Sequence, residues 1–471
     1  MRALGIALVA LVGCRQSPSA MTDRPRVEGS GSAAPASEMG ATPAAKQFDA
    51  WLAVFNKGDR AALVAYHAQQ FPYAVASNDI QGVEREAGLS SGTGGFDVKI
   101  VERPSPTQII VTMKEKHSDQ IARATMDVDP VEPHHVTKFE IHPIPTPPEL
   151  LSPELAALQR IDDKRRRAVV DAIARELDAH YVAPDVGTKM IAAMRDHLAR
   201  GDYDAITQAP DLAAALTKDL REVSHDKHLG VDFMPRRPNM PPPSPDAQRE
   251  MRRDMAKRAN YGFGAIERMP NNIARLEIRG FPPILDDDSR AAVGEQMSKV
   301  ADADAVIFDL RNNGGGSPDT VALFLSYVFD KPTHINSMYS RDTGKTEESW
   351  TLSDVKGKRF GGKKPVFVVT SNRTFSGGEE FTYDLQTQRR ATIVGETTGG
   401  GAHPVEGHPL EGGFGVRVPW GRPINPVTKK DWEGTGVVPD VAVAADAALD
   451  QAHQLAVAEL ARRSGPHNAP R

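Results

Sequence analysis

A serine with the surroundings of a nucleophile lies in residues 365–381, PVFVVTSNRTFSGGEEF. The apolar, β-branched start of this stretch predicts a buried strand, and Ser371 and Asn372 are turn residues. Ser376 precedes two glycines and two glutamates, which suit the first turn of a helix. A serine placed there exposes its hydroxyl beside a backbone N–H that can stabilise an oxyanion. This predicts acyl-transfer chemistry at Ser376, although a simple N-cap serine has the same local pattern and the G-x-S-x-G motif is absent.

A glycine-rich segment, NNGGG at 312–316, directly follows the apolar run AVIFDLR. It lacks the lysine and hydroxyl residue of a P-loop and the spacing of a dinucleotide-binding fingerprint. The segment is therefore either a tight turn or a second set of backbone N–H donors close to Ser376.

Length and composition set limits on the elements that position these residues. The chain has 471 residues, enough for roughly two or three domains. With 40% hydrophobic residues it can form a sizeable core, and its net charge of -5 gives no reason to expect nucleic acid as a partner. A single cysteine excludes an intrachain disulfide framework.

The N-terminus has the pattern of a secretory signal. A basic start and a short apolar run end in Leu-Val-Gly-Cys, which resembles a bacterial lipobox. Residues 1–14 are then a lipoprotein signal peptide, and acyl groups on Cys14 anchor the mature chain to a membrane. A plain secretory signal is the alternative, and both place the protein outside the cytoplasm, in the bacterial cell envelope. Residues 15–45, rich in Ser, Gly, Pro and Ala, predict a flexible linker.

Residues 46–144 predict a first domain, in which an amphipathic helix and a second helix precede four alternating strands. This order, with a W-x-x-x-F-N-x-G-D pattern, resembles the α+β cone of the nuclear-transport-factor-like fold. Such domains often bind small molecules or partners. His134 and His135 are adjacent, but no third ligand lies at a useful spacing, so we interpret them as loop histidines.

The rest of the chain divides into three parts. Residues 155–233 show three- and four-residue apolar spacing and predict a helical cap. The proline- and arginine-rich residues 234–260 predict a loop or lid. Residues 261–471 alternate strands and helices, with a last helix after residue 445, and predict an α/β core.

Five motifs occur in order between residues 157 and 461: HYVAPDVGTKM with LTKDLREVSHDKHLGV, VIFDLRNNGGG, TSNRTFSGGEEF, VGETTGGGAHP and WEGTGVVPDV. Together they resemble the tail-specific protease family of serine peptidases, in the branch of the tricorn core and the interphotoreceptor retinoid-binding protein repeats. The resemblance implies a multidomain protein whose catalytic core has the crotonase/Clp-protease-like α/β fold, and it strengthens the nucleophile hypothesis for Ser376.

Two chemistries occur in this family. The Ser–Lys branch places a lysine where this chain has Gly401, and the interval between Val231 and Ala265 is too short for the PDZ domain of that branch. The tricorn-like branch implies a triad of Ser376, His228 and Glu433. His228 would be the general base, Glu433 would orient it, and the amides of Gly377 and Gly315 would form the oxyanion hole.

One position departs from the tricorn-like pattern, because Lys227 replaces the serine that precedes the histidine. His225 and His403 are reserve candidates for the base. His228 could alternatively be a structural histidine that pairs with Asp226. With a histidine base, activity should rise with pH through a value near the ordinary pKa of histidine.

We therefore expect a lipid-anchored, extracytoplasmic serine peptidase that acts on peptides or unfolded chains through a Ser–His–Glu acyl-enzyme. A binding protein for an apolar ligand and a non-peptidic ester or amide hydrolase are the alternatives. No cofactor or metal is implied, and the sequence does not indicate an oligomeric state.

Overall fold

The computed structural model describes residues 41–71, 80–117, 120–144, 146–151, 153–234, 244–284 and 286–464. Contacts divide them into two units, one ending at Ala156 and the other beginning at Ala157. The expected signal peptide with Cys14, nearly all of the expected linker, and residues 235–243 of the expected lid lie outside the described residues.

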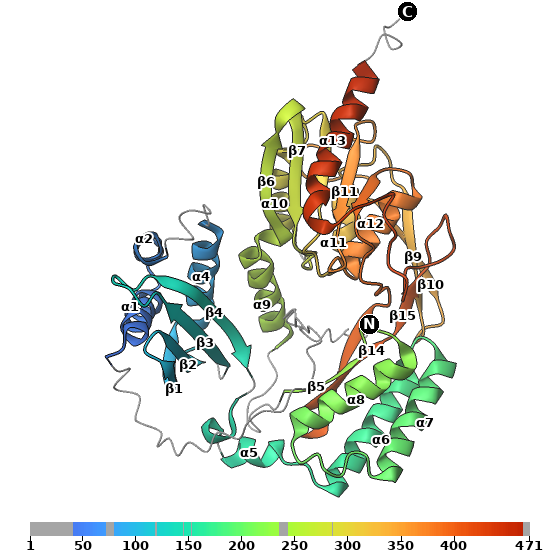
Figure 1. The fold of residues 1–471 in the computed structure, drawn as a ribbon. Helices are drawn as coiled ribbons and strands as arrows, with labels where there is room; N and C mark the ends of the chain where they lie inside the picture. Colours follow the sequence, from blue (N-terminus) through green and yellow to red (C-terminus); the bar gives the residue numbers. More distant parts are fainter. Residues whose placement is uncertain are drawn as a thin grey trace, which may run out of the picture. The chain divides into compact units, whose positions relative to one another are not determined.

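The smaller unit packs helices on an antiparallel sheet with strand order β1-β2-β3-β4 (Figure 1). Its elements are α1 (Pro43–Lys57), α2 (Arg60–Gln70), α4 (Ile80–Thr93), β1 (Phe96–Ser105), β2 (Gln108–Glu115), β3 (Ile121–Val128) and β4 (Val136–Ile144). Phe48 and Phe55 of α1 share a buried face, as their spacing predicts. The sequence did not indicate α4, and α1 begins inside the expected linker. The nuclear-transport-factor-like assignment stays a prediction.

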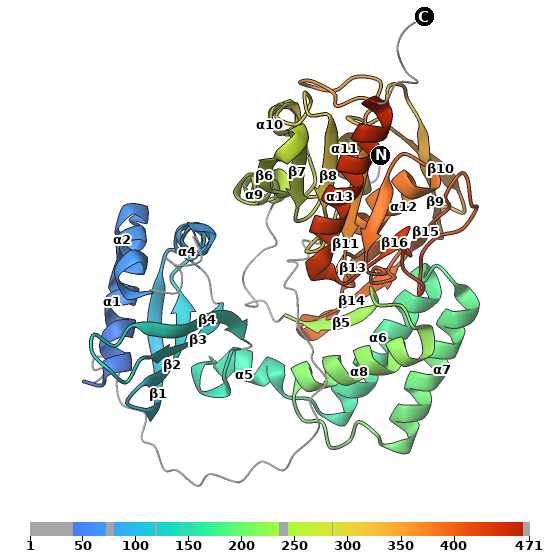
Figure 2. The same cartoon turned by 45° about the horizontal axis from the view of Figure 1, so that its top comes forward.

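The larger unit begins with the helical cap. The turn η1 (Pro148–Leu150) still belongs to the smaller unit, and α5 (Pro153–Gln159) crosses the boundary. The cap then contains α6 (Asp163–His180), α7 (Pro184–Arg200), α8 (Ala209–Ser224) and the strand β5 (Gly230–Phe233). Helices α5 and α6 are separate because the chain breaks before Asp162, whose carboxylate accepts the Arg165 N–H at 2.7 Å. An aspartate at this position caps a new helix rather than continuing the old one. Helices α6, α7 and α8 lie alongside one another in Figures 1 and 2.

The core of this unit is a six-stranded sheet with the order β16-β12-β11-β8-β7-β6. Its strands are β6 (Phe263–Met269), β7 (Ile273–Ile278), β8 (Ala305–Asp309), β11 (Val366–Thr370), β12 (Thr392–Gly395) and β16 (Val441–Ala442). All neighbours are parallel except β6 and β7. Parallel order brings the carboxyl ends of β8 and β11 to one edge, where the glycine segment and Ser376 follow.

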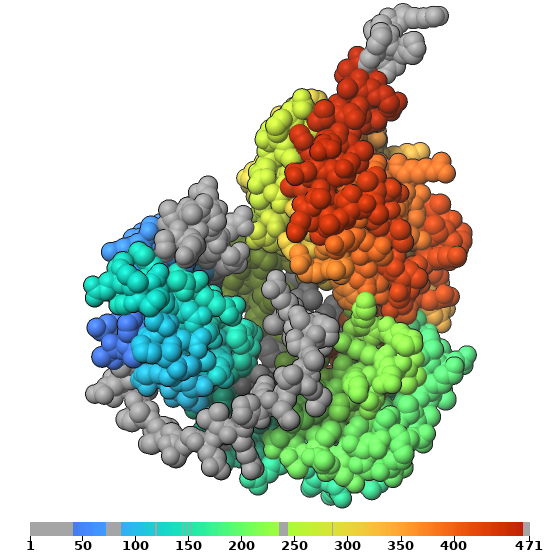
Figure 3. Space-filling model, viewed as in Figure 1, coloured from blue at the N-terminus to red at the C-terminus, as the bar shows by residue number. Residues whose placement is uncertain are grey.

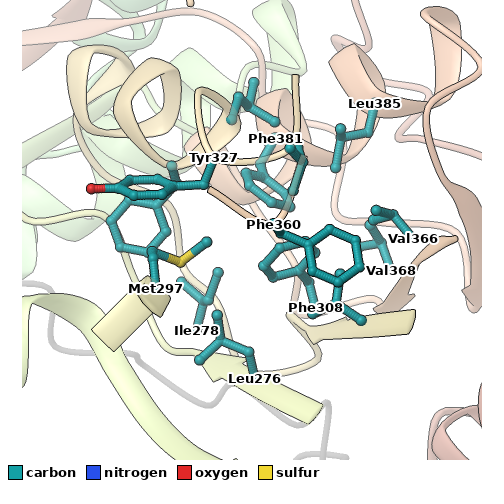
Figure 4. Packing of buried hydrophobic residues seen from close by; sticks show 14 of the residues in the cluster. Leu276, Ile278, Met297, Phe308, Tyr327, Phe360, Val366, Val368, Phe381 and Leu385 are labelled. Atoms are coloured by element: carbon teal, nitrogen blue, oxygen red, sulfur yellow. The ribbon is translucent and has the colours of Figure 1, made fainter. Parts of the chain in front are cut away.

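Helices cover both faces of this sheet, so its strands are apolar on both sides. Along β8, Val306 and Phe308 pack with α10 (Asp287–Ser298), α11 (Pro318–Leu325) and α12 (Gly377–Thr387). Ala305 and Ile307 pack instead against alanines of α13 (Ala445–Ser464). Figure 4 shows Phe308 and Phe381 among the side chains of the first cluster, and Figure 3 shows α13, in red, on the surface.

Smaller sheets flank this core. One contains β10 (Thr346–Trp350), β9 (His334–Ser340) and β15 (Gly421–Pro423); another contains β13 (Val405–Pro409), β14 (Phe414–Pro419) and β5. Short 3₁₀ turns occur at η2 (Asn260–Gly262), η3 (Pro270–Asn272) and η4 (Glu411–Gly413). Strand β14 thus pairs with β13 and with β5 of the cap rather than with the core sheet.

The expected loop or lid at 234–260 contains a helix, α9 (Pro245–Arg258). Ser244 caps it by accepting the Ala247 N–H at 3.2 Å, and Pro245 stands at its first position. The prediction of a loop was wrong for α9, because its arginine-rich composition lacks the apolar spacing by which a helix is recognised.

Phe308 provides a test of how the core is packed. It is fully buried, with its ring 5.2 Å from that of Phe381. Phe308→Ala should lower the unfolding free energy of this unit by about 3–5 kcal/mol, since the cavity cannot collapse completely. Denaturant unfolding followed by circular dichroism measures the change. Val427→Ala is the control, because Val427 is 56% exposed and should change stability by no more than about 0.5 kcal/mol. Equal stabilities of the two variants would contradict this packing.

Candidate active site

Ser376 lies between β11 and α12 in a strained backbone conformation, with φ 52° and ψ −122°. This lies outside the regions that L-residues ordinarily occupy, and such strain persists where the surrounding structure enforces it. The Ser376 N–H donates to Glu379 Oε2 at 2.9 Å, which fixes the turn. The chain therefore makes a sharp strand-to-helix turn at this serine without the G-x-S-x-G sequence.

The glycine segment after β8 lies directly against Ser376. A β-carbon on Gly315, whose φ is 101°, would lie 2.7 Å from Ser376 Cβ and 2.8 Å from Gly377 N, so only glycine fits. The Gly315 N–H itself donates to Asn313 Oδ1 at 2.8 Å. The N–H groups of Gly316 and Gly377 donate to no other residue in the described ranges.

This arrangement modifies the expected oxyanion hole. A β-carbon built on Gly377 would lie 3.0 Å from Gly316 N, so the amides of Gly316 and Gly377 are close neighbours. Gly315 was expected to supply the second donor, but its amide already has an internal acceptor. The hole itself stays a prediction, with Gly316 as the second donor.

His228 lies next to the residue that precedes the serine. Its ring centroid is 4.7 Å from that of Phe375, and its backbone N–H donates to Asp226 Oδ1 at 3.0 Å. The Nδ1 atom is buried and has no partner among the described residues. Burial lowers the pKa of His228 to about 4, although the charge of Asp226 acts in the opposite direction. The imidazole is therefore neutral, and able to accept a proton, at neutral pH.

Glu433 contacts a different histidine from the one expected. Its Oε2 accepts the N–H groups of Ala402 at 2.5 Å and of His403 at 3.3 Å, and lies 3.7 Å from His403 Nδ1. Burial, followed by the charge of Asp226, raises the pKa of Glu433. No hydrogen bond between Glu433 and His228 occurs in the part of the chain that the structure describes.

Asp226, which the sequence suggested only as a structural partner of His228, makes hydrogen bonds to both His228 and His403. It is 1% exposed, and its Oδ2 lies 2.7 Å from His403 Nδ1 while Oδ1 accepts the His228 N–H. Burial pushes the pKa of Asp226 upward, but the hydrogen bond and charge of His403 outweigh burial and leave it lowered. For His403, burial lowers the pKa, yet Asp226 and Glu433 more than compensate and raise it.

The structure also places the other three positions that the sequence singled out, His225, Lys227 and Gly401. His225 ends α8 with φ 56° and is exposed, and no side-chain hydrogen bond joins it to these residues in the described ranges. Lys227, where the family pattern has serine, donates from Nζ to the Gly399 carbonyl at 2.6 Å. A β-carbon on Gly401 would overlap the Phe375 ring and lie 2.8 Å from His228 Cε1, so this position has no room for the lysine of a Ser–Lys enzyme.

Glu379, whose role the sequence analysis missed, joins the serine to the loop at 398–401. This fully buried carboxylate accepts the N–H groups of Ser376, Gly400 and Gly401 and the hydroxyl of Thr398, at 2.5–2.9 Å. Burial raises its pKa in spite of these four donors. Its position three residues after the N-cap is a capping-box signal, but only the structure shows the bonds to the distant loop.

Two further carboxyl groups lie on the inner face of α12. Glu380 and Asp384 are both buried. Asn336 donates to Glu380 at 3.1 Å, and Asn425 donates to Asp384 at 3.4 Å. Asp384 Oδ2 has no partner among the described residues. Burial raises the pKa of Glu380 to about 7 and that of Asp384 well above its ordinary value. The helix that follows the serine therefore holds acids that favour their neutral form.

The site combines a strained serine at a strand–helix turn, two free amides beside it and a buried neutral imidazole. Hydrolases that use a serine nucleophile require these groups. Residues 272–443 match the model of peptidase family S41, and residues 160–261 match the model of the N-terminal domain of Peptidase_S41 in eukaryotic IRBP. The chain thus contains a peptidase S41 domain and an S41 N-terminal domain, and its enzyme class is that of a serine-type peptidase. This confirms the family that the sequence motifs indicated and the expected class of enzyme.

Solved structures also resemble the chain. They include a candidate peptidase from Parabacteroides merdae, with 18% identity over 62% of this chain and 97% of that one and a TM-score of 0.43. A lipoprotein from Streptococcus agalactiae has 14% identity over 64% and 97% and a TM-score of 0.43. The photosystem II D1 C-terminal processing protease has 15% identity over 60% and 94% and a TM-score of 0.39. The family assignment rests on the two sequence matches and not on these likenesses.

Glu379→Gln tests the role of this carboxylate. An amide in its place turns an N–H₂ group toward backbone donors, so at least one buried donor loses its acceptor. We expect the unfolding free energy to fall by about 1–3 kcal/mol and the rate of active-site acylation to fall at least tenfold. Denaturant unfolding and the rate of labelling by a fluorophosphonate measure the two effects. Glu411→Gln, at an exposed glutamate, is the matched control, and unchanged acylation in Glu379→Gln would show that Glu379 does not position the serine.

Proposed function

We propose that the chain hydrolyses peptide bonds through an acyl-enzyme formed on Ser376, with His228 as the general base. The observation that carries the proposal is the strained Ser376 beside the free amides of Gly316 and Gly377. Residues of this kind make a nucleophile and an oxyanion hole when they converge on one point.

In this mechanism Ser376 Oγ attacks the scissile carbonyl carbon while His228 takes its proton. The amides of Gly316 and Gly377 stabilise the negative oxygen of the tetrahedral intermediate. The protonated His228 then gives its proton to the leaving amine, and a water molecule, activated in the same way, releases the second product. The low pKa of His228 supports this role, since the free base predominates at neutral pH.

The carboxylates act through the loop that faces the histidine. Asp226 holds the His228 backbone and the His403 ring, and Glu433 holds the amides of residues 402 and 403. We propose that Glu433, the carboxylate of the expected triad, positions the loop at 401–403 against His228 and stabilises positive charge in this cluster.

We propose peptides or unfolded protein chains as substrates and the bacterial cell envelope as the location, with Cys14 as the lipid anchor. The family supports a peptide or protein substrate. The location rests on residues 1–14 of the sequence. None of the helices in the described ranges is long and apolar enough to cross a membrane.

Ser376→Ala tests the nucleophile. The wild-type protein should react with a fluorophosphonate probe, and the variant should not. The unfolding free energy should change by no more than about 0.5 kcal/mol, since alanine occupies the same partly exposed turn. Labelling of both proteins would place the reactive group elsewhere. Failure of both folded proteins to label would favour a binding protein for an apolar ligand.

The pH dependence of labelling separates the two candidate bases. If His228 is the base, the rate should rise with pH through about 4 and be flat near neutrality, because protonated His228 cannot accept the serine proton. The sequence alone suggested that activity rises near the ordinary pKa of histidine. Because burial lowers the pKa of His228, the expected rise moves to lower pH. If His403 is the base, the rate should rise above pH 6.5, its ordinary value, because Asp226 and Glu433 raise its pKa. Rates for wild type and His403→Gln between pH 3.5 and roughly 9 decide between them.

A further inference from the structure

Four side chains outside the proposed active site converge where the cap meets two neighbouring elements. Glu176 and His180 are four residues apart on α6 and therefore share a face. His408 comes from β13, and Asp342 lies in the turn between β9 and β10. Glu176 Oε2 lies 3.0 Å from His408 Nδ1 and 3.7 Å from His180 Nε2.

The spacing of these three groups matches the coordination sphere of zinc. Bonds of roughly 2.1 Å at tetrahedral angles place neighbouring ligand atoms roughly 3.4 Å apart. The two measured separations lie on either side of this value, and the ligand atoms of Glu176, His180 and His408 all lie within 4.8 Å of one another. Two imidazoles and a carboxylate are ligands that divalent transition metals accept.

The surrounding contacts favour metal binding over a simple ion pair. His180 Nδ1 lies 2.8 Å from Asp342 Oδ1, so a proton held there leaves the Nε2 lone pair directed toward Glu176. Carboxylates commonly orient metal-bound histidines in this way. The His180 and His408 rings stack with centroids 4.6 Å apart, and the same Glu176 oxygen faces a nitrogen of each ring.

The exposure of the three side chains also suits the binding of an ion from solution. The side chains of His180, Glu176 and His408 are 30%, 29% and 16% exposed, so an ion can reach them and a water molecule can complete the coordination. A second group of three donors, Asp226, His403 and Glu433, belongs to the proposed active site. Both oxygens of Asp226 and Oε2 of Glu433 already have hydrogen-bond partners in the protein, and only Glu433 Oε1 has none in the described ranges, which makes this group the weaker candidate.

We propose that Glu176, His180 and His408 bind a divalent transition-metal ion of the zinc class, and that Asp342 positions His180. The ion would join α6 to β13, and Asp342 would extend the link to the β9–β10 turn. The sequence did not indicate the site, because its residues are distant in the chain and only Glu176 and His180 show a helical spacing.

The experiment uses the full chain, freed of metal with a chelator. Zn²⁺ is titrated by calorimetry, and Co²⁺ by visible absorption, which reports tetrahedral coordination directly. We expect one equivalent to bind, with the intense bands of tetrahedral cobalt, and Zn²⁺ to raise the melting temperature. His408→Gln and Glu176→Gln should each weaken binding at least tenfold. Asp342→Asn should weaken it by about 10–100-fold.

His403→Gln is the matched control and should bind the ion as wild type does. Far-UV circular dichroism of each metal-free variant establishes that it is folded, and the Asp342→Asn variant provides a second test should a ligand variant fail to fold. Absence of binding by wild type, or equal affinities of wild type and His408→Gln, would overturn the proposal. Loss of binding only in His403→Gln would overturn it too, since the ion would then occupy the proposed active site.

Discussion

The buried carboxylate of Glu379 connects the two segments on which the reactive geometry depends. It accepts the N–H of Ser376 on its own helix and three donors from the loop at 398–401. That loop continues into Ala402 and His403, which Glu433 holds, and Gly401 lies against the His228 ring. Burial of a carboxylate is costly unless each lone pair is used, so the four donors and the carboxylate require one another. The serine, the imidazole and the loop therefore keep their relative positions as one hydrogen-bonded unit.

The sheet supplies the second constraint. Adjacent parallel strands bring the turn after β8 and the turn after β11 to the same edge, where the glycine segment can approach Ser376. Helices on both faces bury the strands, so this edge is rigid. The cap contributes His228 through β5, which pairs with β14 and so ties the helical segment to the chain beyond the loop at 398–401.

Much of this arrangement could be predicted from the sequence, because it depends on local patterns. The continuous apolar runs of β8 and β11 indicated buried strands, and each is followed by a segment in which the sequence predicted function, namely the glycines at 312–316 and Ser376. The family resemblance, confirmed by the sequence matches, then linked Ser376 to a serine peptidase.

The finer assignments depended on contacts between distant residues. The Asn313 side chain accepts the N–H of Gly315 and leaves that of Gly316 free. No local sequence pattern shows which of the two glycines bonds to Asn313. The pairing of Glu433 with His403 depends on how the loop at 401–403 folds over Trp432, whose indole donates to the Gly401 carbonyl. Asp226 is two residues before His228, a spacing that permits a side-chain bond to its N–H, but its bond to His403 is tertiary.

The two inward acids of α12 make the stability of this enzyme depend on pH between mild acid and neutrality. Folding raises the pKa of Glu380 from 4.5 to about 7, so the folded state holds this proton more tightly than the unfolded chain does. The resulting stabilisation is complete below the unfolded pKa and is lost as the pH rises through the folded value. The helix that begins after Ser376 is thus held most firmly in mild acid. A fall in stability as the pH rises from 4.5 to about 7 would then report loosening of the scaffold around Ser376, and not a change in proton transfer.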